Sequence, residues 1–149
     1  MTKKSSIKIG IAGFGIVGKK RRACIDSNPN YQLISVCDQK LDGSGIMKDG
    51  VNFHQNYKNL IEDELDAVLV CMSNDMASEV SIAALRKGLH VFCEKPPGRS
   101  VREVMDVVDA EKENPSLKLM YGFNHRYHDS VEDALDILNS GELGAVINI

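Results

Sequence analysis

The sequence predicts an α/β fold, in which a doubly wound parallel sheet has helices on both faces. Strand-length apolar runs alternate along the 149 residues with stretches whose apolar residues recur at helical spacing. The run Ala67–Met72 is almost purely apolar, which is typical of a parallel strand that helices cover on both faces. A glycine-rich turn directly follows the first such run. These observations together indicate the fold class.

The first 38 residues carry the pattern on which this prediction depends most. The apolar run Ile7–Ala12 predicts a strand, and a helix is expected from Ile16 to about Ser27. A second apolar run, Leu33–Cys37, ends on Asp38. This order of elements is typical of a Rossmann-like dinucleotide-binding domain, which has a strand, a glycine turn, a helix and a second strand that ends on an acidic residue.

The turn GFGIVG gives each of its glycines a separate task. Gly13 permits the tight turn, Gly15 lets the backbone approach a pyrophosphate, and Gly18 lets the helix pack close to the sheet. The pyrophosphate would lie over the helix N-terminus, where free N–H groups and the helix dipole favour negative charge. An ordinary strand-to-helix turn is the simpler alternative. The candidate cofactor-binding residues here are Gly13, Phe14, Gly15, Ile16, Val17 and Gly18.

Asp38 is the candidate residue for cofactor specificity. A carboxylate at this position can accept hydrogen bonds from both ribose hydroxyls and would repel a 2′-phosphate, so NAD is favoured over NADP. Lys40 is near enough in sequence to soften that repulsion. A basic run opens the first helix, and it lies either near the cofactor phosphates or on a solvated outer face. Its members are Lys19, Lys20, Arg21 and Arg22.

The rest of the chain continues the alternation of strands and helices. Residues 39–59 are predicted to be irregular, apart from a short third strand at Val51–His54. Ser100 and Glu103 have the spacing of a capping box that starts a helix, and Asn114-Pro115 stops it. Gly88 is expected to cap the helix before it. Further strands are expected at Ala67–Met72, Leu89–Cys93 and Leu117–Phe123, and a last helix at Val131–Leu138.

Ligands of such sheets bind at the carboxyl ends of the strands, and two polar segments are expected there. Ser73 and Asn74 follow one strand, where they either line the cleft or cap the next helix. Glu94 and Lys95 follow the next strand and are stiffened by two prolines, which favours side chains aimed into the site. A lysine can hydrogen-bond a substrate hydroxyl and stabilise a developing alkoxide. A surface ion pair on a turn is the simpler alternative.

The composition limits which partners the protein is expected to bind and where in the cell it is expected. The net charge of −3 gives no basic field for nucleic acid, and the apolar runs are too short to cross a bilayer. The N-terminus lacks the features of a signal peptide, so a cytoplasmic protein is expected. The four cysteines are interpreted as buried, reduced packing residues, although Cys93 would lie beside the site. His125 and His128 have no visible third ligand, so no metal site is predicted.

Several segments resemble the Gfo/Idh/MocA oxidoreductases. These are GFGIVG, Asp38, FCEKPPGRS and the stretch YGFNHRYHDSVEDALDILNSGELG. The resemblance implies an enzyme that uses NAD or NADP to oxidise or reduce a sugar, a nucleotide sugar, a cyclitol or a related hydroxyl compound. It makes Lys95 the catalytic residue that reaches substrate and nicotinamide, with Glu94 beside it, and it places Asn124 and Arg126 at the substrate cleft. It also implies a second α+β domain that commonly serves oligomerisation, and hence a homo-oligomer.

Two departures from the family pattern matter. Ser73, Asn74 and Met76 stand where the family often has a threonine-proline-asparagine turn and a histidine or tyrosine. Family members are also about twice as long, and their acid–base residues lie in the second domain. The chain is therefore expected to comprise a cofactor domain at 1–123 and the start of a cut-short second domain at 124–149, with a strand at Val146–Ile149.

The chain alone is expected to bind NAD(H) and to turn over substrate poorly. A non-catalytic module that binds NAD(H) as a sensor or regulator is the main alternative, and Lys95 argues against it, since a sensor needs no lysine in a substrate cleft. An interaction protein that pairs through the helix Val131–Leu138 is a third interpretation.

Overall fold

The computed structural model describes residues 6–145 and 147, and a seven-stranded sheet forms its centre. The strand order is β3-β4-β2-β1-β5-β6-β7, and neighbours pair in parallel except for the antiparallel pair β3 and β4. The order reverses at β1, between β2 and β5, so the predicted doubly wound sheet is confirmed. The strands are β1 (Ile7–Ala12), β2 (Tyr31–Cys37), β3 (Ser44–Ile46), β4 (Asn52–His54), β5 (Ala67–Val70), β6 (His90–Cys93) and β7 (Leu119–Tyr121).

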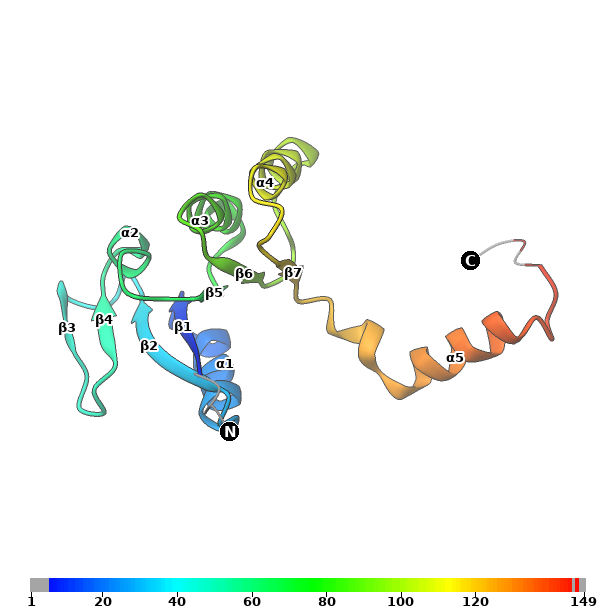
Figure 1. Ribbon diagram of the computed structural model, residues 1–149, viewed down its shortest axis with the longest axis horizontal. Helices are drawn as coiled ribbons and strands as arrows, with labels where there is room; N and C mark the ends of the chain where they lie inside the picture. Colours follow the sequence, from blue (N-terminus) through cyan, green and yellow to red (C-terminus); the bar gives the residue numbers. More distant parts are fainter. Residues whose placement is uncertain (1–5, 146, 148–149) are drawn as a thin grey trace.

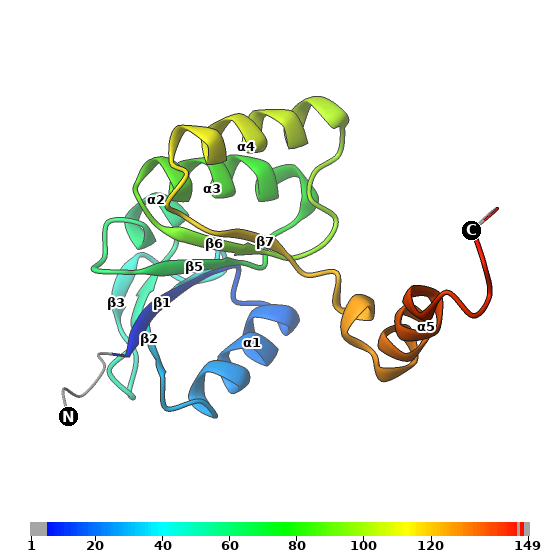
Figure 2. The ribbon, with the colours of Figure 1, turned by 45° about the vertical axis from the view of Figure 1, so that its right-hand side comes forward.

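Helices form a layer on each side of this sheet. Helices α2 (Tyr57–Leu60), α3 (Asn74–Arg86) and α4 (Val101–Glu113) cover one face, and α1 (Ile16–Asp26) lies against the other (Figures 1 and 2). A short 3₁₀ helix, η1 (Asn124–Tyr127), and helix α5 (Asp129–Ser140) follow β7 and lead away from the sheet (Figure 2).

The burial of alternate strand residues shows how unequally the two faces are covered. Val68 and Val70 of β5 are buried against the α3 side, as are Val91 and Cys93 of β6. The residues between them face the α1 side and are only partly buried. There, an apolar cavity of about 500 Å³ lies between α1 and strands β1, β5 and β6. Helix α1 therefore covers the β1–β2 part of its face and leaves the β5–β6 part open.

The stretch predicted to be irregular, residues 39–59, contains more structure than the sequence indicated. It holds β3, β4 and most of α2, and the expected strand Val51–His54 begins at Asn52 as β4. Strand β3 is a three-residue edge strand that includes Gly45, so it has no apolar alternation to detect. Helix α2 has four residues, fewer than the helical period needs to become visible. Asn56 caps it by accepting a hydrogen bond from the Lys58 N–H at 2.9 Å.

Helix α4 begins at the expected place, but its capping differs in one bond. Ser100 Oγ accepts a hydrogen bond from the Glu103 N–H at 3.2 Å, as a capping box requires. The Glu103 carboxylate accepts from the N–H of Arg99 at 2.7 Å, and not from that of Ser100. The Arg99 guanidinium also binds this carboxylate, and these contacts lower the pKa of Glu103. Gly88, with φ +87°, follows the end of α3, which confirms the expected cap.

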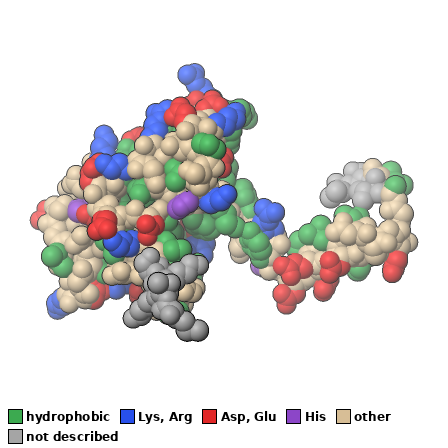
Figure 3. Space-filling model, in the orientation of Figure 1, with side chains coloured by type: hydrophobic (Ala, Val, Ile, Leu, Met, Phe, Trp, Pro, Cys, Tyr) green, Lys and Arg blue, Asp and Glu red, His purple; other side chains and the backbone are tan. Residues whose placement is uncertain are grey.

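Helix α5 is the least buried element of the structure. None of its described side chains is buried, and Leu135, Ile137 and Leu138 are exposed. Acidic side chains gather along one edge of it (Figure 3), and its first turn contains Asp129 and Glu132. The strand expected at Val146–Ile149 lies almost wholly outside the described residues. In the part of the chain that the structure describes, no helix combines the length and apolar character needed to span a membrane.

Candidate functional site

Gly13 and Gly18 of the turn between β1 and α1 are required by close approaches of the backbone. Gly13 has φ +94°, and a Cβ there would lie 2.5 Å from the carbonyl oxygen of Cys71. A Cβ on Gly18 would overlap the carbonyl oxygen of Gly13. The N–H of Gly13 also donates to the carbonyl of Cys37 at 2.9 Å, which fixes the turn against β2. The turn is therefore held by packing on both sides.

Gly15 has a different environment, because a Cβ there would meet no atom within 4 Å. It is the N-cap residue of α1, where no side chain caps the helix and no acidic residue lies in the first turn. The start of α1 thus has open space at Gly15 and no negative charge on its own turn, which is an arrangement that suits an anion. Packing does not explain a glycine here.

Asp38 joins the turn to the segment after β2. Its Oδ2 accepts a hydrogen bond from the Phe14 N–H at 3.0 Å, and its Oδ1 accepts from the Lys40 N–H at 3.0 Å. A carboxylate offers about four acceptor positions, so two remain for a ligand. The sequence led to a ribose-binding role for Asp38, but it gave no sign of this second, structural role.

The turn and Asp38 surround a cavity of about 700 Å³. Five candidate residues line it, namely Phe14, Gly15, Ile16, Val17 and Asp38. The other lining residues are Lys19 and Lys40, which the sequence analysis considered as neighbours of the cofactor, and Leu41, Met47 and Cys71, which it did not select. Leu41 and Met47 belong to the stretch predicted to be irregular, where two apolar residues without a strand pattern were the only available signal. Lys19 and Lys40 place positive charge at this cavity.

Ser73 and Asn74 do not line the cavity. Ser73 occupies the N-cap position of α3 with an extended backbone, but its side chain makes no capping hydrogen bond among the described residues. A hydrogen bond from Ser73 lowers the pKa of the Asp75 carboxyl. Ser73 thus holds the N-cap position that one of its two alternatives expected, without the side-chain hydrogen bond of a cap.

Glu94 and Lys95 follow β6 at the same sheet edge. The Glu94 Oε1 accepts a hydrogen bond from Arg21 Nε of α1 at 2.6 Å, and the Glu94 side chain is only 16% exposed. Lys95 is exposed and precedes Pro96 through a cis peptide bond. The Arg21 guanidinium carbon lies 5.1 Å from the ring centre of Phe92 in β6. Sequence reasoning missed Arg21 as the partner of Glu94.

Asn124 and Arg126 have separate surroundings. Asn124 lines a small cavity of about 190 Å³ together with Arg21, Phe92 and Tyr127. Arg126 is exposed, and its guanidinium carbon lies 5.6 Å from the Tyr127 ring centre. The rings of His125 and His128 stack at 4.9 Å. Among the described residues, no three His, Cys, Asp or Glu side chains gather as metal ligands would.

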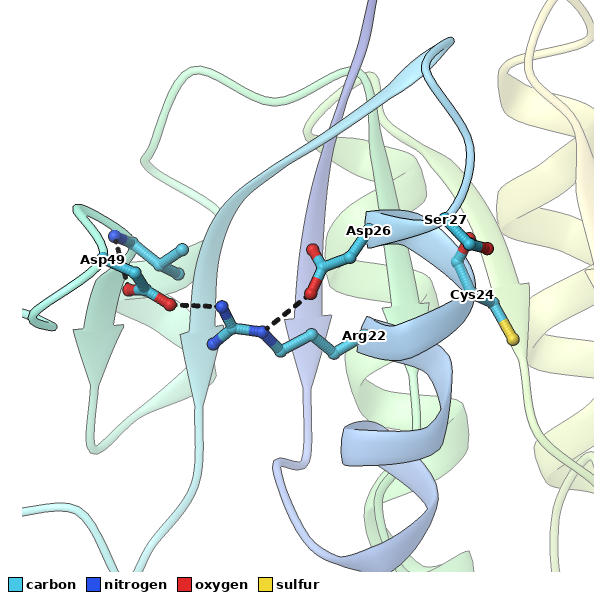
Figure 4. Close-up of polar contacts among 6 residues, drawn as sticks. Arg22, Cys24, Asp26, Ser27 and Asp49 are labelled. Carbon is cyan, nitrogen blue, oxygen red and sulfur yellow. Dashed lines mark hydrogen bonds and ion pairs between the residues drawn. The ribbon is translucent and has the colours of Figure 1, made fainter.

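The basic run of α1 divides between three environments. Lys19 lies at the large cavity, and Arg21 pairs with Glu94. Arg22 binds the carboxylates of Asp26 and Asp49, which raises the pKa of Arg22 and lowers that of Asp49 (Figure 4). The arginines are thus neither bound at the cavity nor free on a solvated face.

The four cysteines differ in how far they are buried. Cys37 and Cys93 are buried, as expected, and Cys71 is partly buried. Cys24 is exposed, so the prediction that it is buried was wrong. It lines the apolar cavity between α1 and the sheet.

The sequence also matches a known protein family and several of its members. The profile of the family GFO_IDH_MocA, described as "Oxidoreductase family, NAD-binding Rossmann fold", matches residues 7–123. Inositol 2-dehydrogenase of Salmonella typhimurium (strain LT2) is 30% identical over 148 residues, which cover 93% of this chain and 43% of that protein.

Two solved structures are similar in fold. Myo-inositol 2-dehydrogenase from Lactobacillus plantarum superposes with a TM-score of 0.81 at 28% identity, covering 96% of this chain and 44% of that one. Scyllo-inositol dehydrogenase from Lactobacillus casei, with bound NAD(H) and scyllo-inositol, gives 0.82 at 24% identity, covering 94% and 43%. The chain thus spans less than half the length of these relatives.

Proposed function

Because the chain belongs to the Gfo/Idh/MocA oxidoreductases, with the NAD-binding Rossmann fold of that family, we propose that it is the cofactor-binding half of an NAD-dependent dehydrogenase. The combination of the open Gly15 position, the uncapped start of α1 and the Asp38 carboxylate around one cavity carries this proposal. A dinucleotide would supply a nicotinamide ring that accepts or gives hydride. The chain's own residues would bind and orient it.

The start of α1 would hold the pyrophosphate. The absence of a Cβ at Gly15 lets phosphate oxygens approach the first N–H groups of α1, where the helix dipole also favours negative charge. Lys19 lies at the same cavity, and its positive charge would also attract the pyrophosphate without covering the N–H groups. Gly13 and Gly18 would act indirectly by keeping the turn in this shape.

Asp38 would select the ribose. Its two remaining acceptor positions would take the ribose hydroxyls, while its charge would disfavour a 2′-phosphate, so NAD is proposed over NADP. Lys40 lies at the same cavity and would reduce that discrimination. The apolar side chains of Leu41 and Met47 would pack against the adenine ring on the far side of Asp38.

Lys95 is proposed as the catalytic residue, which would hydrogen-bond the reacting oxygen of the substrate. Its ammonium group can donate to a hydroxyl and stabilise negative charge that develops on oxygen. Ser73, Asn74 and Glu94 would line the nicotinamide side, and Asn124 and Arg126 the substrate side. We propose a polyol as substrate, a cyclitol first, on the ground that the relatives compared above are inositol dehydrogenases.

The domain boundary is proposed after Phe123, where the sheet has ended and η1 begins. Residues 124–149 would open a second domain that completes the substrate site and makes the homo-oligomer. A cytoplasmic location is proposed with it, in keeping with four free cysteines.

The test is a calorimetric titration of the chain with NADH and with NADPH, repeated on Asp38→Ala. Loss of the ribose hydrogen bonds should weaken NADH binding at least about tenfold, since bonds to a charged acceptor contribute roughly 1.5–3 kcal/mol each. NADPH binding should weaken less, because the repulsion of its phosphate is removed as well. Damage to the turn alone would weaken both equally.

Asp42→Ala provides the matched control, because Asp42 is an exposed carboxylate four positions away. It should leave both affinities unchanged. A parent chain that binds neither dinucleotide would overturn the proposal, and a preference for NADPH would overturn the role given to Asp38.

A further inference from the structure

We infer that Arg21 is a positioning residue, whose ion pair with Glu94 fixes the segment that carries Lys95 against helix α1. The inference rests on the proposed function, in which Lys95 reaches the substrate. It concerns a residue that lies in the first helix, far in sequence from the segment that it would hold.

Arg21 makes three contacts with the end of β6. Its Nε donates to Glu94 Oε1 at 2.6 Å, and a second guanidinium nitrogen binds the same oxygen. The guanidinium carbon lies 5.1 Å from the Phe92 ring centre, within reach of a cation–π interaction. The side chains of Arg21 and Glu94 are only 33% and 16% exposed, so water screens this pair less than it screens a surface pair.

Glu94 is also confined from the side of β7. A Cβ on Gly122 would lie 2.9 Å from Glu94 Oε2 and 3.2 Å from Phe92 Cζ, so the carboxylate packs directly on that backbone. The Gly122 N–H donates to the carbonyl of Cys93 at 2.8 Å, which keeps β7 beside the end of β6. Glu94 is thus held between α1 and β7, and the backbone at the next residue, Lys95, is held with it.

The charges of the pair act on one residue of the candidate cofactor cavity. Cys71 lines that cavity, and its pKa, raised to about 12 mainly by desolvation, is raised further by the charge of Glu94 and lowered by that of Arg21. Without Arg21, the largely buried Glu94 carboxylate, one residue before Lys95 in the chain, would be left as an uncompensated negative charge. Arg21 therefore neutralises Glu94 as well as holding it.

The experiment compares Arg21→Gln, Glu94→Gln and the double variant by the reactivity of Lys95. Trace acetylation at one pH, with peptides quantified by mass spectrometry, measures Lys95 against the exposed Lys58 as internal reference. Arg21→Gln should slow acetylation of Lys95 about threefold, because the unpaired Glu94 carboxylate can then form an ion pair with the ammonium group of its neighbour in the chain. Glu94→Gln should speed it by a similar factor, and the double variant should return close to the parent rate.

Three further measurements make the result specific. Arg86→Gln breaks another arginine–glutamate pair between elements, the exposed Arg86–Glu113 pair of α3 and α4, and should leave Lys95 unchanged. Arg21→Lys keeps the charge and serves if Arg21→Gln does not fold, and it should react nearly as the parent does. NADH affinity should fall in Arg21→Gln and not in Arg86→Gln.

Shifts of the two single variants in the same direction, or an equal effect of Arg86→Gln, would overturn the inference. Failure of the parent chain to bind NADH would instead overturn the proposed function. The acetylation rates would still show whether Arg21 and Glu94 determine the reactivity of the Lys95 amine.

Discussion

Three glycines of one turn occupy three different surroundings. Gly13 needs a positive φ and a close approach to Cys71, and Gly18 leaves no room for a Cβ beside the carbonyl of Gly13. Gly15 has open space around it. Gly13 and Gly18 are thus needed for the folded shape of the turn, whereas Gly15 leaves room for a ligand. Substitutions of single glycines can therefore test stability and ligand binding separately.

Gly15→Ala and Gly18→Ala should fail in different ways. Gly18→Ala should lower the melting temperature, because the new Cβ overlaps backbone that cannot move freely. Gly15→Ala should melt as the parent does and bind NADH at least about tenfold more weakly, because the methyl group would occupy the space proposed for phosphate. Calorimetric melting and NADH titration of both variants check this. Normal NADH binding by Gly15→Ala would contradict the phosphate site.

Residues close together in sequence were predictable, and contacts between distant residues were not. The glycines and Asp38 lie within one strand-turn-helix-strand unit, whose geometry is local enough to follow from spacing. The Arg21–Glu94 pair joins residues 73 positions apart, so it depends on how α1 packs beside β6. The exposure of Cys24 depends likewise on which part of a sheet face the helices leave open.

At the scale of elements, buried or partly buried thiols lie at or directly after the carboxyl ends of β2, β5 and β6. Burial raises the pKa of Cys37 to about 11 and that of Cys71 to about 12, and it also raises the pKa of Cys93. The folded chain therefore holds these protons at a pH where an unfolded chain has released them. The cause is desolvation of a charged thiolate between sheet and turn.

This arrangement predicts a loss of stability in mild alkali. The free energy of unfolding should be unaffected by these thiols below about pH 8.5, the pKa of a free thiol, and should fall as pH rises above it, by at most about 1.4 kcal/mol per pH unit for each thiol. Urea unfolding at several pH values, under reducing conditions, measures the slope. The double variant Cys37→Ala/Cys71→Ala should flatten it, and Cys24→Ala, which changes an exposed thiol, should leave it unchanged.

Element length decided which parts of the fold the sequence could predict. The helices α1, α3 and α4 span three turns or more, and their apolar spacing or caps indicated them. Strand β3 shows no apolar alternation, and helix α2 is too short for the helical period to be recognised. Both depend on tertiary contacts, β3 on pairing with β4 and α2 on Leu60, which is fully buried in the core.

At the scale of the whole molecule, the sheet and α5 are energetically separate. The largest buried cluster lies between the sheet and the helices α2, α3 and α4, and none of its members comes from α5. The apolar side chains of α5 are exposed to solvent instead. Changes in α5 should therefore have little effect on the unfolding of the sheet.

The double variant Leu135→Glu/Leu138→Glu tests this separation. Since both side chains are exposed, it should change the free energy of unfolding by no more than about 0.5 kcal/mol. Leu85→Ala is the contrasting variant, because Leu85 in α3 is fully buried, and it should cost roughly 2–5 kcal/mol. Denaturant unfolding measures both. A large loss in the α5 variant would show that α5 packs on the sheet.

The two backbone hydrogen bonds of Asp38 have a consequence for redesign of the protein. The usual way to change the preference between the two dinucleotides would be to replace this acidic residue. Here that replacement would also release the N–H groups of Phe14 and Lys40, and with them the brace between the turn and the segment after β2. An engineer who wants the phosphorylated cofactor would do better to keep the carboxylate and alter the side chains around it.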